Sequence, residues 1–230
     1  MNVDWIPVTR FEQNCSILWC EATARAAVID PGGDLERILD FLEWESLKLE
    51  VVLVTHGHFD HCGGAKELAA RTGARIEGPH RNEQHILEGL AEYGARYGVR
   101  AQSFVPDRWL AHGDRIRFGE VEIEALHCPG HSKGHMAYFH APTKIAFVGD
   151  ILFRGAIGAW EHGDGNLAEL VSSIRDKLFP LGDDVRFVPG HGETSTFGHE
   201  RRDNPFVGDA VMERIKRGLS PVARLSDPHL

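Results

Sequence analysis

Residues 50–61 have the sequence EVVLVT-HGHFDH, in which a strand-like run is followed at once by a cluster of polar side chains. The first six residues are nearly all apolar, which is typical of a strand buried within a parallel sheet. The next six contain His56, His58, Asp60 and His61. Because open α/β sheets bind ligands outside the carboxyl ends of their strands, we expect this stretch to supply a central strand and part of a site.

Apolar runs and amphipathic segments alternate around this stretch. The pattern predicts strands at residues 15–20, 25–30 and 74–77, and helices that begin at Asp34 and span residues 63–71. Residues 80–98 also have a helical pattern, although three glycines interrupt it. This order of strands and helices implies parallel strands joined by right-handed crossovers.

The second half of the chain repeats the arrangement of strands followed by a helix. It predicts a helix at residues 166–179 and strands at residues 115–118, 120–127, 136–140, 144–148 and 185–188. We therefore predict an α/β fold in which two mixed sheets pack face to face with helices outside, an αβ/βα sandwich. We expect residues 1–230 to form one domain.

Composition narrows the classes of function. The chain of 230 residues has a net charge of −9, which argues against nucleic acid or an anionic membrane as the main partner. No run approaches the ~20 apolar residues of a membrane span, and no signal peptide is apparent, so we expect a cytoplasmic protein. Four cysteines do not suggest a disulfide framework. Fourteen histidines indicate metal or acid/base chemistry.

Three further polar residues follow predicted strands in one repeated pattern. In each case an apolar strand is followed by a glycine and then by a potential metal ligand: His131, Asp150 or His191. Taken alone, each is more often an ordinary turn residue or a satisfied histidine. The repetition favours a shared site formed with the loop after residue 55.

Together these residues offer five imidazoles and two carboxylates and no thiolate, which favours an open catalytic site over a closed structural one. Such a set can hold two divalent ions, most simply Zn²⁺, although iron and manganese accept the same ligands. Two ions can hold a bridging hydroxide and polarise the carbonyl group that it attacks. The reaction then needs no serine or cysteine nucleophile.

The segments around His56–His61, His131, Asp150 and His191 resemble the metallo-β-lactamase superfamily. The resemblance implies the αβ/βα fold and two metal sites. The first site would use His56, His58 and His131, the second Asp60, His61 and His191, and Asp150 would bridge them. Asp60 would also orient the nucleophile. Lactamases of this fold commonly have cysteine at the position of Asp150, so antibiotic hydrolysis is disfavoured.

The residues from 14 to 206 resemble short bacterial glyoxalase II-like proteins more closely, in segments such as 126–131, 149–153 and 189–196. This resemblance implies hydrolysis of small hydroxyacyl thioesters such as S-lactoylglutathione. The alternatives are a persulfide dioxygenase with one iron on the same scaffold, and a hydrolase of another ester or of a lactone.

Two departures bear on the substrate. Only 39 residues follow His191, so we expect no C-terminal helical glutathione-binding domain. The family commonly has a cation after the glycine that matches Gly158, where this chain has Ala159. Arg154 is the candidate contact for an anionic substrate, and residues 80–100 are a candidate substrate wall or a solvated helix. His135 is a candidate support for a ligand or a packed core residue.

Overall fold

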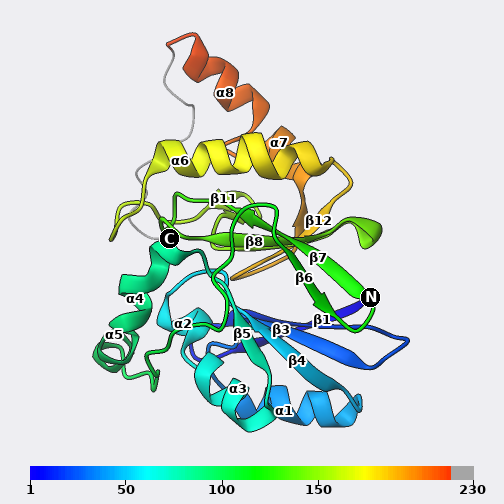
Figure 1. Cartoon of the computed structure of the whole chain (residues 1–230). Coiled ribbons are helices and arrows are strands. Elements are labelled where there is room, and N and C mark those ends of the chain that lie inside the picture. The colour runs from blue at the N-terminus through cyan, green and yellow to red at the C-terminus, as the bar shows by residue number, and fades with distance from the viewer. Residues whose placement is uncertain (219–230) are drawn as a thin grey trace.

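The computed structural model describes residues 1–218, and two facing sheets organise them (Figure 1). The first sheet has the order β1-β2-β3-β4-β5, with β1 and β2 antiparallel to their neighbours and β3, β4 and β5 parallel. Its strands are β1 (Asn2–Val8), β2 (Gln13–Trp19), β3 (Arg25–Ile29), β4 (Lys48–Leu53) and β5 (Arg75–Glu77).

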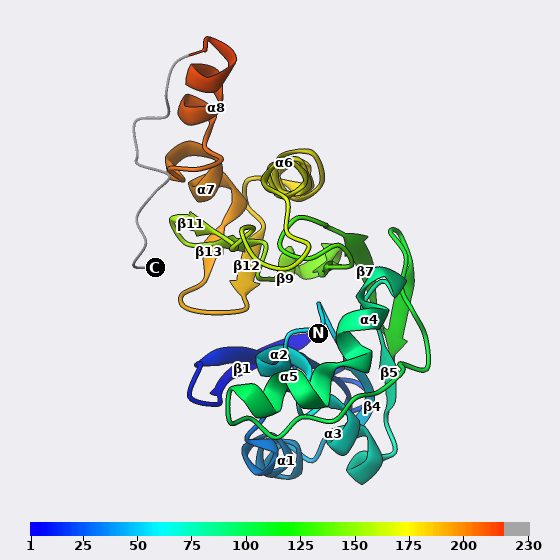
Figure 2. The ribbon, with the colours of Figure 1, turned by 90° about the vertical axis from the view of Figure 1, so that its left-hand side faces the viewer.

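Helices cover the outer face of this sheet and extend to its edge (Figure 2). They are α1 (Leu35–Trp44), α2 (Phe59–Cys62), α3 (Ala65–Thr72), the 3₁₀ turn η1 (Arg81–Glu83), α4 (Gln84–Glu88) and α5 (Leu90–Arg96). The predicted helical segment 80–98 is therefore divided, and the division falls at Gly89, between α4 and α5.

The second sheet has the order β13-β12-β9-β8-β7-β6, in which only β12 and β9 are parallel. Its strands are β6 (Arg115–Phe118), β7 (Val121–His127), β8 (Met136–His140), β9 (Ile145–Gly149), β12 (Arg186–Pro189) and β13 (Ser195–Thr196). A small hairpin lies beside it, formed by β10 (Leu152–Phe153) and β11 (Ala156–Ile157). Its helical segments are η2 (Ala141–Thr143), α6 (Leu167–Ser172), η3 (Ser173–Leu178), η4 (Phe179–Leu181), α7 (Phe197–Asp203) and α8 (Asp209–Lys216).

Three apolar clusters fill the spaces between these layers. The central cluster joins the two sheets and includes Leu53, Ile123 and Phe147, each at most 2% exposed. The other two clusters lie between each sheet and its helices. Burying apolar side chains of both sheets against each other is the main stabilising contribution to such a fold. The αβ/βα sandwich predicted from the sequence is confirmed.

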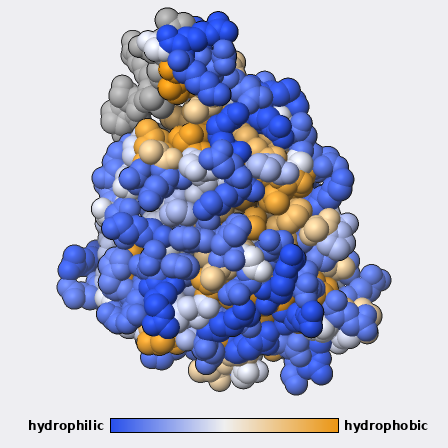
Figure 3. All heavy atoms as spheres, turned by 45° about the horizontal axis from the view of Figure 1, so that its top comes forward, coloured by the Kyte–Doolittle hydropathy of each residue, from blue (hydrophilic) through white to orange (hydrophobic). Residues whose placement is uncertain are grey.

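The outer surface is mostly polar. Figure 3 shows one predominantly hydrophilic face on which apolar residues appear in patches. No helix among residues 1–218 is long and apolar enough to cross a membrane. The assignment of all residues 1–230 to one domain stays a prediction, and residues 219–230 lie outside the described part of the chain.

The structure also contains strands that the sequence pattern did not predict. β1 pairs with β2 over seven residues, although Pro7 lies within it. As an edge strand, β1 tolerates a residue without an N–H donor. β10, β11 and β13 have only two residues each, too short to show a periodic pattern.

Candidate metal centre

The loop after β4 brings four of the predicted ligands together. His58 has an extended backbone, and its carbonyl accepts hydrogen bonds from the N–H groups of His61 and Cys62, both at 3.0 Å. This turn begins the short helix α2, which carries Asp60 and His61. His56 and His58 therefore precede the turn, and the other two side chains lie one turn further along.

The second sheet brings the other three candidates to the same edge. Asp150 and His191 follow the neighbouring parallel strands β9 and β12, and Gly190 N donates to Gly149 O at 2.8 Å. Gly149 has a φ of 48°, and a Cβ there would lie 2.7 Å from the ring of His135. A Cβ at Gly190 would lie 2.1 Å from Asp150 Oδ1. Gly149 and Gly190 therefore leave space for the side chains of His135 and Asp150, which a larger residue at either position would displace.

The first group of donors consists of three histidines. His58 Nδ1 lies 3.0 Å from His56 Nε2 and 3.1 Å from His131 Nε2. The second group consists of Asp60, His61 and His191, whose candidate ligand atoms all lie within 4.8 Å of one another. These are the two sets predicted from the resemblance.

Asp150 lies between the groups and faces both. Its Oδ1 is 3.3 Å from His61 Nε2, while its Oδ2 is 3.8 Å from His131 Nε2 and 3.9 Å from His191 Nε2. One carboxylate can therefore reach both donor sets, as a bridging ligand must.

Hydrogen bonds at the far side of each ring decide which nitrogen faces the centre. His131 Nδ1 donates to the Ala159 carbonyl at 2.8 Å, and His191 Nδ1 donates to the Phe11 carbonyl at 3.0 Å. Carbonyl oxygens only accept, so the proton must be on Nδ1 and the Nε2 lone pair must point inward. His61 is oriented in the same way by the carboxylate of Asp30, 2.8 Å from its Nδ1.

The buried atoms at the centre fit metal ions. His61 Nε2 and Asp150 Oδ1 are buried and have no hydrogen-bond partner among the described residues. Several imidazole and carboxylate donors converge there with few hydrogen-bond partners, an arrangement that costs free energy unless a cation compensates it. The imidazole and carboxylate donors therefore suit a dinuclear metal centre, while zinc, iron and manganese are all compatible with them.

The pKa shifts of the histidines differ between the first and the second donor group. Burial, followed by the neighbouring His61, lowers the pKa of His56 well below its ordinary value, and burial and His131 lower the pKa of His58 to about 4. Burial also works to lower the pKa of His61, but the carboxylates of Asp150 and Asp60 outweigh it and raise that pKa. Neutral imidazoles in the first group are in the state that binds metal.

Asp30 and Thr55 support the centre and were not among the predicted site residues. Asp30 accepts hydrogen bonds from Thr55 N at 2.7 Å, from Thr55 Oγ1 at 2.5 Å and from His61. Thr55 Oγ1 in turn lies 3.0 Å from His56 Nδ1. Asp30 directly follows an apolar strand and precedes Pro31, without the glycine that precedes Asp150, so a broader search for carboxylates at strand ends could have found it.

Glu83 is a second support that the sequence did not reveal. Its fully buried carboxylate accepts from Gly57 N at 2.9 Å and from Gly134 N at 2.7 Å. Burial raises the pKa of Glu83. One side chain from η1 therefore links the loop that carries His56 and His58 to the loop that carries His131.

His135 fulfils both interpretations offered for it. It is fully buried and its ring stacks on that of His56, with centroids 4.6 Å apart. Its Nε2 also accepts from Asp150 N at 3.1 Å, so it holds the backbone of a candidate ligand.

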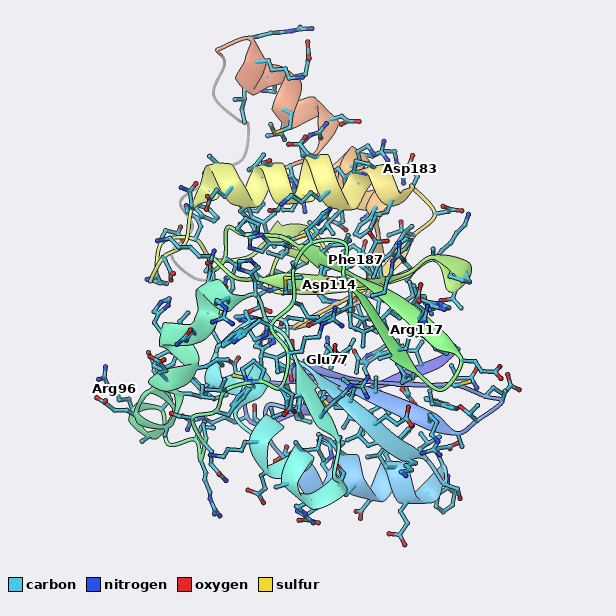
Figure 4. The ribbon with its side chains drawn as sticks, viewed as in Figure 1. Glu77, Arg96, Asp114, Arg117, Asp183 and Phe187 are labelled. Carbon is cyan, nitrogen blue, oxygen red and sulfur yellow. The ribbon has the colours of Figure 1, made fainter. Side chains whose placement is uncertain are left out.

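A cavity of about 580 Å³ opens beside the first donor group. Its wall includes His58 and His131, and Tyr93 and Tyr97 from the predicted substrate wall. Arg96 of the same segment instead lies at the outer edge of α5, paired with Glu92 (Figure 4). Arg154 does not line this cavity, and its exposed guanidinium pairs with the exposed carboxylate of Glu193.

Comparison with known proteins agrees with this geometry. Residues 8–191 match the family described as the metallo-beta-lactamase superfamily, so the chain belongs to that superfamily. It is a metallo-hydrolase of the glyoxalase II-like kind. Hydroxyacylglutathione hydrolase GloC of Haemophilus influenzae is 43% identical over 209 residues, which are 90% of this chain and 98% of that protein.

Two solved structures share the fold along most of the chain. The BLEG-1 B3 metallo-beta-lactamase aligns with a TM-score of 0.82 and 30% identity, over 90% of this chain and 99% of that one. TTHA1623 in a di-iron-bound form aligns with a TM-score of 0.80 and 30% identity, over 88% and 99%.

Proposed function

We propose that this protein hydrolyses small hydroxyacyl thioesters, with S-lactoylglutathione as the representative substrate. The observation that carries the proposal is the pair of donor groups that Asp150 faces, next to an open cavity. The similarity to a protein named hydroxyacylglutathione hydrolase supports the thioester as substrate. The proposed ligands are His56, His58 and His131, then Asp60, His61 and His191, with Asp150 shared.

Two bound ions would lower the pKa of a water molecule to about 7 and polarise the substrate carbonyl. Residues of the chain would position the attacking water and the substrate. Asp60, whose Oδ2 lies 3.4 Å from His191 Nε2, would accept a hydrogen bond from the attacking water and so orient it. Tyr93 and Tyr97 would hold the acyl thioester against the ligand side of the cavity and limit access of bulk water.

The proposed leaving group does not require a dedicated proton donor. A thiolate is stable at neutral pH to a far greater extent than an alkoxide, because a thiol has a pKa of about 8.5. The products are a hydroxy acid and a free thiol. Localisation in the cytoplasm and the choice of Zn²⁺ as metal remain part of this proposal.

The test is hydrolysis of S-lactoylglutathione by protein of known metal content, with Asp150→Asn as the deficient variant. We expect thiol release to fall by at least about a thousandfold, since a Lewis-acid contribution of several kcal/mol is lost. Metal content should fall with it. Asp184→Asn, which changes an exposed aspartate paired with Lys144, is the matched control.

The result also separates the competing functions. Full activity of Asp150→Asn with one equivalent of metal would refute the bridging role. One bound iron, oxygen uptake with a persulfide and no thioester hydrolysis would favour the dioxygenase. Two bound ions with hydrolysis of a lactone or a β-lactam but no thioester would retain the hydrolase and exclude the proposed substrate.

A further inference from the structure

A second cavity adjoins the one beside the metal centre and is lined by charged and polar groups that the proposed reaction does not use. It has a volume of about 560 Å³ and is lined by Asn82, His85, Lys133, Gly163 and Asp164. Three of these, His85, Gly163 and Asp164, also line the inner cavity. A ligand that extends outward from the metal centre would therefore enter this second cavity, which we call the outer cavity.

One loop leads from the metal centre to the outer cavity through consecutive residues. His131 is a proposed ligand, Ser132 lines the inner cavity and Lys133 lines the outer one. Ser132 Oγ is buried beside the carboxylate of Glu83, toward which its hydroxyl can donate. The loop therefore runs from a proposed ligand along the inner cavity to the outer cavity within three residues.

The backbone around Lys133 is held in place while its ammonium is free. The Lys133 carbonyl accepts from His127 Nε2 at 2.9 Å, and Gly134 N donates to the buried Glu83. The exposed ammonium of Lys133 forms no ion pair within the described part of the chain. The side chain therefore extends from a fixed loop with its charge available to a ligand.

Asp164 supplies the opposite charge in the same cavity. Its side chain is 19% exposed, and its Oδ2 lies 3.6 Å from Nε2 of the exposed His85. Asn82 adds an amide group, which can donate and accept. A cation and a carboxylate that line one cavity without pairing with each other are suited to a ligand end that bears both a carboxylate and an ammonium group.

We propose that the outer cavity binds the amino-acid end of the substrate's thiol half, with its carboxylate on Lys133 and its ammonium group on Asp164. This inference rests on the proposed thioester hydrolysis. Ala159 lines the inner cavity and offers no charge, so Lys133 is the cation in these two cavities that can select a carboxylate. The class of carrier is then a small peptide-like thiol rather than a neutral thiol.

The first measurement is the affinity of the metal-loaded protein for S-methylglutathione, determined by calorimetry. We expect Lys133→Ala to weaken binding by about threefold to tenfold, the range of a partly exposed ion pair. Lys133→Arg should retain most of the affinity because the charge is kept. Lys48→Ala is the control, since Lys48 is exposed at the opposite end of β4 from the metal loop.

The second measurement compares S-lactoylglutathione with the lactoyl thioester of N-acetylcysteamine, whose thiol half has neither a carboxylate nor an ammonium group. The ratio of their kcat/KM values should fall by about threefold to tenfold in Lys133→Ala and stay unchanged in Lys48→Ala. Asp164→Asn should lower the same ratio, but not when the amino group of glutathione is acetylated. Thermal unfolding of each variant confirms that it folds.

Equal binding of S-methylglutathione by Lys133→Ala and Lys48→Ala would overturn the outer cavity as a subsite. Binding that depends on Lys133, without hydrolysis of either thioester, would support the subsite and refute the proposed function. Hydrolysis of both thioesters, with a kcat/KM ratio that is the same in Lys133→Ala and in the unchanged protein, would support the proposed function and refute the subsite.

Discussion

The two halves of the sandwich provide their candidate ligands in different ways. The first half carries four of them within residues 56–61, directly after β4, whereas the second half carries one after each of β7, β9 and β12. Their supports differ as well. Side chains of Asp30, Thr55 and Glu83 hold the first set, while the backbone carbonyls of Ala159 and Phe11 hold His131 and His191.

This difference determines which of the supporting hydrogen bonds a single substitution can remove. A side-chain support can be removed by one mutation, but a carbonyl oxygen is present whatever residue stands at its position. The supports of His56 and His61 should therefore be sensitive to substitution, whereas the orientation of His131 and His191 should not depend on the side chains at positions 159 and 11.

Asp30→Asn should give the largest effect, because it removes one of the two oxygens that hold Thr55 and His61. Loss of such an outer hydrogen bond typically weakens metal binding by about 10-fold to 100-fold. Competition with a chelator of known affinity measures it. Ala159→Ser should leave the affinity unchanged, because His131 bonds to the carbonyl of residue 159. An equal loss of metal affinity in Asp30→Asn and Ala159→Ser would contradict the distinction between side-chain and backbone supports.

Glu83→Gln should have an intermediate effect that extends to both halves. Glutamine has one acceptor oxygen, so either Gly57 N or Gly134 N loses its partner. A buried unsatisfied group costs about 1–3 kcal/mol, which urea unfolding would measure as a lower free energy of unfolding. Glu92→Gln, at an exposed residue of α5, is the control. An unchanged free energy of unfolding in Glu83→Gln would show that the link is not stabilising.

The smallest effect concerns His80 and His127, whose rings stack between the two halves with centroids 4.2 Å apart. Burial lowers the pKa of each. The unfolded chain therefore takes up protons at higher pH than the folded one, and stability should fall as the pH drops below about 6.5. His127→Asn should reduce this decline when urea midpoints are compared at pH 7 and 5.5, with saturating metal. His199→Asn, on α7, should keep it; an identical decline in all three proteins would contradict the assignment.

The sequence predicted the sandwich and the positions of seven candidate ligands, because both depend on local patterns. Apolar runs define β4 and β9, and the ligands follow such strands directly. The supports could not be predicted in this way. Glu83 lies in a polar segment next to Arg81, Asn82 and Gln84, and only the folded chain shows that it is fully buried.

The candidate substrate contacts, which stay predictions, illustrate the same limit. Arg154 follows a strand as the ligands do, yet its partner is Glu193, on the loop after β12. No sequence pattern singles out Lys133, and it shares a cavity wall with Gly163 and Asp164, which are about thirty residues away in the chain. Local pattern predicts residues that belong to strand ends, whereas cavity walls depend on how distant segments pack.

The turn between β1 and β2 links assembly of the fold to loading of its metal. Phe11 in this turn orients His191, and Arg10 donates to the carbonyl of Tyr97 at the cavity wall. His191 belongs to the second half, while Asp60 and His61 belong to the first. The second donor group, like the first with its His131, is therefore complete only after the sheets have docked. Occupancy of that group would be a late event in folding, and its metal uptake rate would report the docking step.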